Sequence, residues 1–168
     1  MIILMAGLPG TGKTALARAL ADRTGGCVLS KDEIRAALFS SDDIEYSSAQ
    51  DDFCMEVMLQ AARFLLQKNP ERKIFLDGRT FSRPYQIDRV LTFATELSQP
   101  WAILECTCSE ESARRRLELA PSHPARNRTF SLYLDVKARF EPIGYQKTVI
   151  DTDHPLEECL GQAMAAVA

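Results

Sequence analysis

Residues 7–14 place three glycines, a lysine and a threonine at a spacing that suits phosphate binding. They match the pattern GxxxxGK[ST] without a gap. We expect Lys13 to contact the β- and γ-phosphate oxygens of ATP as a point charge, and the Thr14 hydroxyl to bind Mg²⁺. The expected nucleotide-binding residues are Gly7, Leu8, Pro9, Gly10, Thr11, Gly12, Lys13, Thr14 and Ala15.

The segments around this run have the character that such a site requires. An apolar stretch at 2–6 predicts a buried strand, and an amphipathic stretch at 13–23 predicts a helix. The glycines allow the chain to fold tightly, so that main-chain N–H groups and the positive end of the helix converge on an anion. The sequence therefore predicts a nucleotide site between the first strand and the first helix.

A second group of reactive residues lies at 30–35, where the next apolar run gives way to a short helix. Ser30 and Glu33 form a capping-box pattern, and Asp32 in the first turn suits the helix dipole, so local structure alone could explain these three residues. It does not explain Arg35, which is three residues after Asp32 and on the same helix face. The chemical interpretation is that Asp32 accepts the proton of an acceptor hydroxyl while Arg35 neutralises nearby negative charge.

Asp77 ends a third apolar run at 73–77. An acidic side chain on a strand beside a phosphate-binding loop faces the metal, so we expect Asp77 to hold Mg²⁺ through water or to position the acceptor. The next residue is Gly78, whereas motor-type ATPases usually have a water-activating glutamate there. This favours phosphoryl transfer over hydrolysis.

The segment at 111–129 has the composition of a lid that closes over the polyphosphate. Its arginines are Arg114, Arg115, Arg116, Arg126 and Arg128. Arginines on a closing flap exclude water and stabilise charge on the transferring phosphoryl group, although clustered arginines often form only a solvated face. Arg116 and Arg126 are the candidates for a catalytic role.

Apolar runs and helical stretches alternate along the chain, which predicts a parallel sheet covered by helices on both faces. Five strands are expected, at 2–6, 27–30, 73–77, 101–106 and 148–151. Helices are expected at 13–23, 48–67, 84–97, 109–119, 131–140 and from 155 to the end. A length of 168 residues suits one domain spanning 1–168.

Composition excludes several classes of protein. A net charge of −3 and a pI near 5.5 provide no general field for a long polyanion, so small or short substrates are favoured and long nucleic acid is not. Five cysteines without CxxC spacing suit reduced thiols in the cytoplasm better than a disulfide framework or a zinc site. The apolar start is too short to span a membrane.

The motifs GLPGTGKT, SKDEIR and IFLDG, followed by the arginine-rich segment, together resemble the polynucleotide-kinase-like and zeta-toxin-like P-loop kinases, a group of small kinases with AAA-type ATP binding. This resemblance implies a three-layer α/β/α P-loop NTPase fold with strand order 2-3-1-4-5. It also implies Asp32 as general base with Arg35 beside it, Asp77 as the acid at a strand end, and adenine near Asp151 and Thr152. Ala120 stands four residues after Arg116, where the group commonly has a second lid arginine, so Arg126 or Arg128 is expected to replace it.

The sequence thus predicts an ATP-dependent kinase that moves the γ-phosphoryl group to a hydroxyl of a small or short acceptor. A nucleoside monophosphate kinase is an alternative, because a DxxR helix and an Asp77-Gly78-Arg79 segment also resemble that group. Arg35 and Arg79 would then clamp an acceptor phosphate, and Asp32 would need no role as a base. A polynucleotide 5′-hydroxyl kinase and a non-catalytic nucleotide switch are further alternatives, although no guanine-reading NKxD motif is present.

Overall fold

The apolar runs form the strands of one parallel sheet in the computed structural model, which describes residues 1–119 and 129–168. The strands are β1 (Ile2–Ala6), β2 (Cys27–Ser30), β3 (Ile74–Asp77), β4 (Trp101–Thr107) and β5 (Thr148–Asp151). Their order is β2-β3-β1-β4-β5, and every neighbouring pair is parallel. The predicted fold class and strand order are confirmed.

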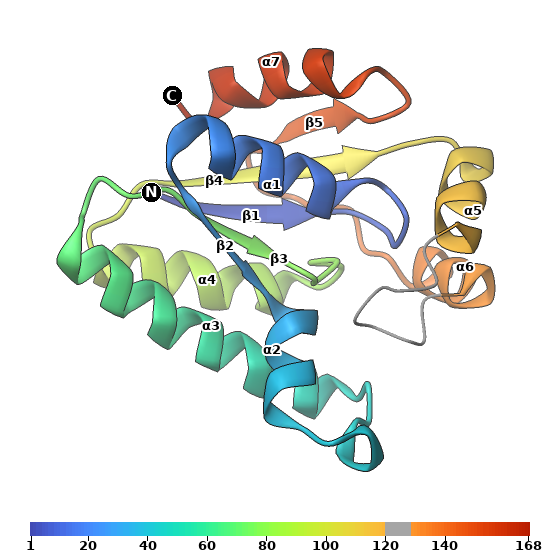
Figure 1. Ribbon diagram of the computed structural model, residues 1–168, viewed down its shortest axis with the longest axis horizontal. Coiled ribbons are helices and arrows are strands. Elements are labelled where there is room, and N and C mark those ends of the chain that lie inside the picture. The colour runs from blue at the N-terminus through green and yellow to red at the C-terminus, as the bar shows by residue number, and fades with distance from the viewer. Residues whose placement is uncertain (120–128) are drawn as a thin grey trace.

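Helices cover both faces of the sheet, and others gather at its carboxyl edge (Figure 1). Within the described ranges they are α1 (Lys13–Thr24), α2 (Lys31–Leu38), α3 (Ser48–Lys68), α4 (Pro84–Glu96), α5 (Glu110–Glu118), α6 (Phe130–Ala138) and α7 (Leu156–Ala166). A 3₁₀ turn, η1 (Ser41–Asp43), joins α2 to the loop before α3. All the predicted helices are present, with ends that differ by a few residues.

Alternation along β1 divides the core into two parts, because successive side chains of a strand point to opposite faces. Ile2 and Leu4 pack with α3 and α4, whereas Ile3 and Met5 pack with α1 and α7. Both faces of β1 are therefore fully buried, as expected for the central strand of a parallel sheet. This places the loop after β1 over the middle of the sheet's carboxyl edge, where ligands of such folds bind.

All five cysteines are free thiols, and three of them, Cys54, Cys106 and Cys159, are buried. Burial raises the pKa of Cys106 to about 12, so this thiol behind the phosphate-binding loop stays protonated and packs as an apolar group. No helix in the described ranges combines the length and the apolar character that a membrane span requires.

Gly7, the residue after β1, has a φ of 127° and no room for a side chain. A Cβ atom there would lie 2.2 Å from the main-chain oxygen of Cys106 on β4. Neither backbone can move without breaking the sheet, so we expect Gly7→Ala to lower the free energy of unfolding by about 3 kcal/mol. Urea denaturation measures this loss.

Gly144→Ala is the matched control, because a Cβ there would meet nothing within 4 Å. Its free energy of unfolding should stay within about 0.5 kcal/mol of the parent value. Equal unfolding midpoints for both variants would show that the chain after β1 has more freedom than its contacts indicate.

Candidate active site

The loop at 7–12 leads directly into α1 and leaves the start of that helix available to a ligand. Gly10 and Gly12 have positive φ angles, which only glycine adopts readily, and these turn the chain back over the helix end. Gly12 is the N-cap residue and, lacking a side chain, provides no capping hydrogen bond. The first N–H groups of α1 therefore point into the loop, the arrangement that binds phosphate at a helix N-terminus.

Lys13 lies inside this loop, where its side chain is largely buried. Its ammonium group donates hydrogen bonds to the carbonyl oxygens of Gly7 at 2.8 Å and Leu8 at 2.6 Å. These contacts hold the positive charge at the mouth of the loop, within reach of an anion bound to the loop N–H groups. The contact between Lys13 and phosphate oxygens stays a prediction.

Thr14 and Asp77 lie together beside the loop, as the sequence predicted for a metal pair. The Thr14 hydroxyl donates to Asp77 Oδ2 at 2.8 Å. Asp77 is 2% exposed, and its Oδ1 has no hydrogen-bond partner among the described residues. A buried carboxylate oxygen without a partner is costly, so a cation or its bound water would stabilise this site.

These oxygens suit Mg²⁺, which commonly takes one or two protein carboxylates and completes its shell with water and substrate phosphates. Within 1–119 and 129–168, no group of three or more His, Cys, Asp or Glu residues could hold a metal ion. Thr14 and Asp77 are the residues that would hold Mg²⁺, together with phosphate oxygens of a nucleotide.

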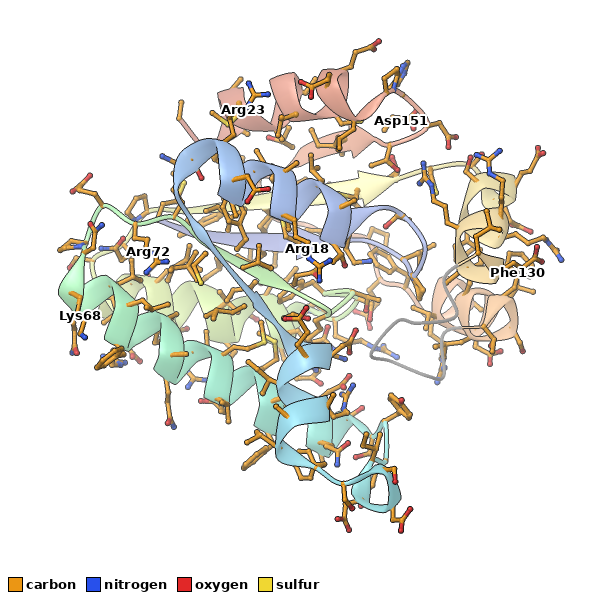
Figure 2. All side chains as sticks on the ribbon, viewed as in Figure 1. Arg18, Arg23, Lys68, Arg72, Phe130 and Asp151 are labelled. Atoms are coloured by element: carbon orange, nitrogen blue, oxygen red, sulfur yellow. The ribbon has the colours of Figure 1, made fainter. Side chains whose placement is uncertain are left out.

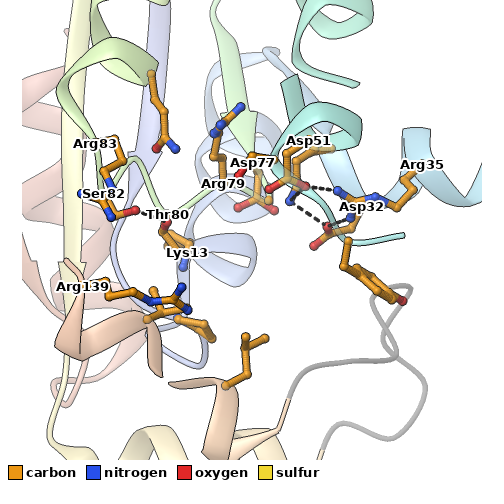
Figure 3. A pocket seen from close by; sticks show the side chains of 18 of the residues that line it. Lys13, Asp32, Arg35, Asp51, Asp77, Arg79, Thr80, Ser82, Arg83 and Arg139 are labelled. Atoms are coloured by element: carbon orange, nitrogen blue, oxygen red, sulfur yellow. Dashed lines mark hydrogen bonds and ion pairs between the residues drawn. The ribbon is translucent and has the colours of Figure 1, made fainter. Parts of the chain in front are cut away.

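Asp32 lies in a compact network of four charged side chains at the start of α2 and α3. Asp32 Oδ1 contacts Arg35 Nη1 at 3.1 Å and Lys31 Nζ at 3.5 Å. Lys31 Nζ also contacts Asp51 Oδ1 at 2.8 Å, and Arg35 Nη2 pairs with the same oxygen. Two positive and two negative charges balance here, and the contacts hold the Asp32 carboxylate in a fixed position (Figure 3).

The capping and chemical interpretations of 30–35 are compatible in the structure. The Ser30 hydroxyl accepts a hydrogen bond from the N–H of Glu33, as an N-cap residue does. Glu33 points away to an exposed ion pair with Arg18. Asp32 and Arg35, by contrast, both line the same cavity as Lys13.

Arg79 forms a second buried arginine site next to this network. Its Nη1 pairs with Asp52 at 2.7 Å, and its Nη2 donates to the Tyr85 hydroxyl at 3.2 Å. Arg35 and Arg79 are thus held by consecutive aspartates of α3, Asp51 and Asp52. Each guanidinium also has a buried Nε with no hydrogen-bond partner among the described residues.

One cavity of about 480 Å³ joins these parts. It extends from Lys13, Thr14 and Asp77 to Asp32, Arg35 and Arg79. Tyr46, Arg83 and Arg139 also line it. A phosphate-binding loop and a fixed carboxylate therefore face a common space.

Arg116 and Thr152 lie on the other side of the phosphate-binding loop. The Arg116 guanidinium donates to Thr152 Oγ1 at 2.9 Å, to Thr152 O at 2.6 Å and to Gly10 O at 3.4 Å. The Thr152 hydroxyl donates to Thr11 O at 3.0 Å. Asp151 precedes Thr152 at the end of β5 (Figure 2). Of the two residues predicted to lie near adenine, Thr152 thus contacts the loop, and the adenine site itself stays a prediction.

Arg116 is not part of the cavity wall formed by the described residues, so its role in transfer stays a prediction. Arg126 and Arg128 lie outside the described residues, as does most of the second half of the predicted lid at 111–129.

Sequence reasoning missed several residues that line the cavity or hold its wall. They are Lys31, Tyr46, Asp51, Asp52, Arg83 and Arg139. Asp51 and Asp52 follow a helix start and suggest only a favourable interaction with the helix dipole. Arg139 lies near the end of a predicted helix, 126 residues after Lys13, so no local pattern links the two.

Solved structures share this fold over nearly the whole chain. Kti12 of Chaetomium thermophilum, in complex with ADP-AlF3, is 16% identical with a TM-score of 0.73, and all of both chains is covered. A gluconokinase of Sinorhizobium meliloti 1021 is 17% identical with a TM-score of 0.69, over 99% of this chain and 90% of that one.

The APS kinase CysC of Mycobacterium tuberculosis, in complex with AMPPNP and APS, is 17% identical with a TM-score of 0.68, over 99% of this chain and 96% of that one. At these identities the likeness shows the fold alone, which is the predicted P-loop NTPase fold. No curated protein matches the sequence.

The sequence profile described as "AAA domain" matches residues 2–143. This range includes the phosphate-binding loop, the Asp32 network, Asp77 and the cavity wall as far as Arg139. Because the match covers most of the sequence, the chain belongs to the AAA domain family.

Proposed function

We propose that the protein is an ATP-dependent phosphotransferase that moves the γ-phosphoryl group to a hydroxyl of a small acceptor. The observation that carries this proposal is the single cavity shared by the phosphate-binding loop and the Asp32 network. ATP phosphates would lie at Lys13, and the acceptor would lie beside Asp32. A volume of about 480 Å³ suits a small molecule.

In the proposed reaction the acceptor oxygen attacks the γ-phosphorus. The bond between that phosphorus and the β–γ bridging oxygen breaks, ADP leaves, and the hydroxyl proton passes to Asp32. Lys31 and Arg35 would hold the Asp32 carboxylate in place, because both contact its Oδ1 atom. Mg²⁺ at Thr14 and Asp77 would neutralise charge on the phosphates.

A screen with labelled ATP tests the proposal, with hydroxyl compounds, nucleosides and short oligonucleotides as acceptors. We expect transfer to a small hydroxyl compound, and a roughly 100- to 1,000-fold lower kcat for Asp32→Asn, because the amide cannot take the proton. ADP affinity, measured by calorimetry, should not change.

Glu33→Gln is the matched control, since Glu33 is the next residue, carries the same charge and has its exposed ion pair with Arg18. Its kcat should equal that of the parent protein. Full activity of Asp32→Asn on a hydroxyl acceptor would exclude Asp32 as the base, and a lack of Mg-ATP binding would exclude the whole proposal.

A nucleoside monophosphate kinase is the second candidate, supported by two buried arginines, Arg35 and Arg79, that line the cavity. A phosphate group on the acceptor would pair with these guanidinium groups. Because a phosphate nucleophile is already ionised, this reaction would tolerate Asp32→Asn. Transfer only to nucleoside monophosphates would favour this candidate.

A further inference from the structure

Most cations on the cavity wall are neutralised by carboxylates. Lys31 and Arg35 pair with Asp32 and Asp51. Arg79 pairs with Asp52, and Arg83 pairs with Glu141. Such pairing holds these side chains in place and cancels much of their charge toward a ligand.

Arg139 differs from these four residues. It follows the last residue of α6 as its C-cap, and its side chain is exposed. Its Nε donates to the main-chain oxygen of Asp135 at 3.1 Å, and no carboxylate of the described residues forms an ion pair with it. Because a guanidinium is always charged in proteins, Arg139 presents a full positive charge to the cavity.

The position of this charge relates it to the phosphate-binding loop. Arg139 and Lys13 both line the cavity, and Figure 3 shows the Arg139 side chain extending from α6 toward Lys13. The two cations belong to different parts of the chain, since Lys13 begins α1 and Arg139 follows α6 as its C-cap. An anion held by the loop would thus have a lysine from one element and an arginine from the other.

Contacts on both sides of Arg139 keep it at this place. Toward the amino end, Tyr133 of α6 packs with Ala113 and Leu117 of α5. Toward the carboxyl end, Glu141 N donates to Ser82 O at 3.1 Å, and the Glu141 side chain pairs with Arg83. The residues around Arg139 are therefore tied to the loop before α4, which forms another part of the cavity wall.

We infer that Arg139 is a catalytic residue that binds the transferring phosphoryl group from the side opposite Lys13. The inference rests on the proposed function. During transfer, negative charge spreads over the three equatorial oxygens of that group, and an arginine fork stabilises it there. Arg116, the described arginine predicted for this work, is instead bonded to Thr152 and Gly10.

A structural role for Arg139 is the competing explanation. A cation at the end of α6 interacts favourably with the helix dipole and binds a terminal carbonyl group, and both effects stabilise a helix without any catalysis. The test must therefore measure binding of a transition-state mimic as well as stability, and it must not depend on the unknown acceptor.

Calorimetry with ADP·Mg²⁺, with and without aluminium fluoride, meets these conditions. ADP affinity should be the same within about twofold for Arg139→Ala and the parent protein. The additional affinity gained from aluminium fluoride should fall on the order of 1,000-fold in the variant. The reason is that the Arg139 guanidinium would contact only aluminium fluoride, which mimics the transferring phosphoryl group. Arg139→Lys keeps the charge at the helix end. Its additional affinity from aluminium fluoride should still fall roughly 10- to 100-fold, since lysine lacks the planar guanidinium group.

Lys137→Ala is the matched control. Lys137 lies in the last turn of the same helix, but it pairs with Glu110 of α5 and does not line the cavity formed by the described residues. The Lys137→Ala variant should keep the additional affinity gained from aluminium fluoride, even if α6 becomes less stable in urea. Guanidinium ion at millimolar concentration should partly restore the affinity of Arg139→Ala.

The outcomes separate the two proposals. If the parent protein does not bind ADP·Mg²⁺, the proposed function fails, and the inference fails with it. If ADP binds normally but Arg139→Ala keeps its aluminium fluoride affinity, the inference alone is wrong. Equal losses in Lys137→Ala and Arg139→Ala would likewise overturn it, because they would indicate a structural role of α6.

Discussion

Lys13→Ala should abolish phosphoryl transfer while the protein still folds. The Lys13 ammonium group is held by two loop carbonyls at the point where β- and γ-phosphates would bind. Without it the phosphates lose a buried charge-assisted contact, so we expect kcat/KM for ATP to fall at least 1,000-fold, or about 4 kcal/mol of transition-state stabilisation. Labelled-ATP transfer measures activity, and circular dichroism measures the fold.

Lys68→Ala serves as the control for this change. Lys68 lies at the end of α3, far from the carboxyl edge of the sheet (Figure 2), and its ammonium group contacts only the ring of Phe64 among the described residues. It should keep full activity. Normal turnover of Lys13→Ala would mean that the nucleotide binds elsewhere, and the proposed function would then be wrong.

Asp77→Asn should produce opposite effects on activity and on stability. The buried Asp77 carboxylate has one oxygen bound to Thr14 and one without a partner among the described residues. An amide is less costly to bury than a charge. Without ligand, the free energy of unfolding of the variant should therefore be about 1 kcal/mol higher than that of the parent. Its kcat should nevertheless fall roughly 100-fold or more, because the metal site loses its carboxylate.

Thermal denaturation with ADP, in the presence and absence of Mg²⁺, measures the metal contribution. The parent protein should gain extra stability when Mg²⁺ accompanies ADP, whereas Asp77→Asn should gain about the same with or without it. Asp22→Asn changes an exposed acid of α1 and should resemble the parent in both assays. A destabilised Asp77→Asn variant with unchanged response to Mg²⁺ would assign Asp77 a structural role only.

The phosphate-binding loop shows why part of the site could be predicted. Its glycines, lysine and threonine are adjacent in sequence, and the conformation depends on neighbouring backbone angles. The strands were predictable for a similar reason, because strands of a parallel sheet are short apolar runs, and β1 and β3 are buried on both sides. The strand order came from the family resemblance, since spacing does not determine which strands pair.

The acceptor side shows why the rest could not be predicted. Asp51 and Asp52 are neighbours in sequence but hold different arginines, Arg35 and Arg79, which belong to different elements. Nothing in the composition of the first turn of α3 indicates these partners. The direction of Arg116 toward Thr152 is similarly a property of how α5 packs against the end of β5.

The amino-acid sequence by itself determined a parallel α/β domain with a nucleotide-type loop after β1, a DxxR helix after β2 and an acid at the end of β3. These features follow from local chemistry: backbone freedom at glycine, periodic apolar residues and short side-chain spacings. Only the tertiary structure decided that Lys13, Asp32, Asp77 and Arg139 share one cavity. Residues more than one hundred positions apart meet there because the order of strands and the packing of helices, rather than sequence distance, place their side chains.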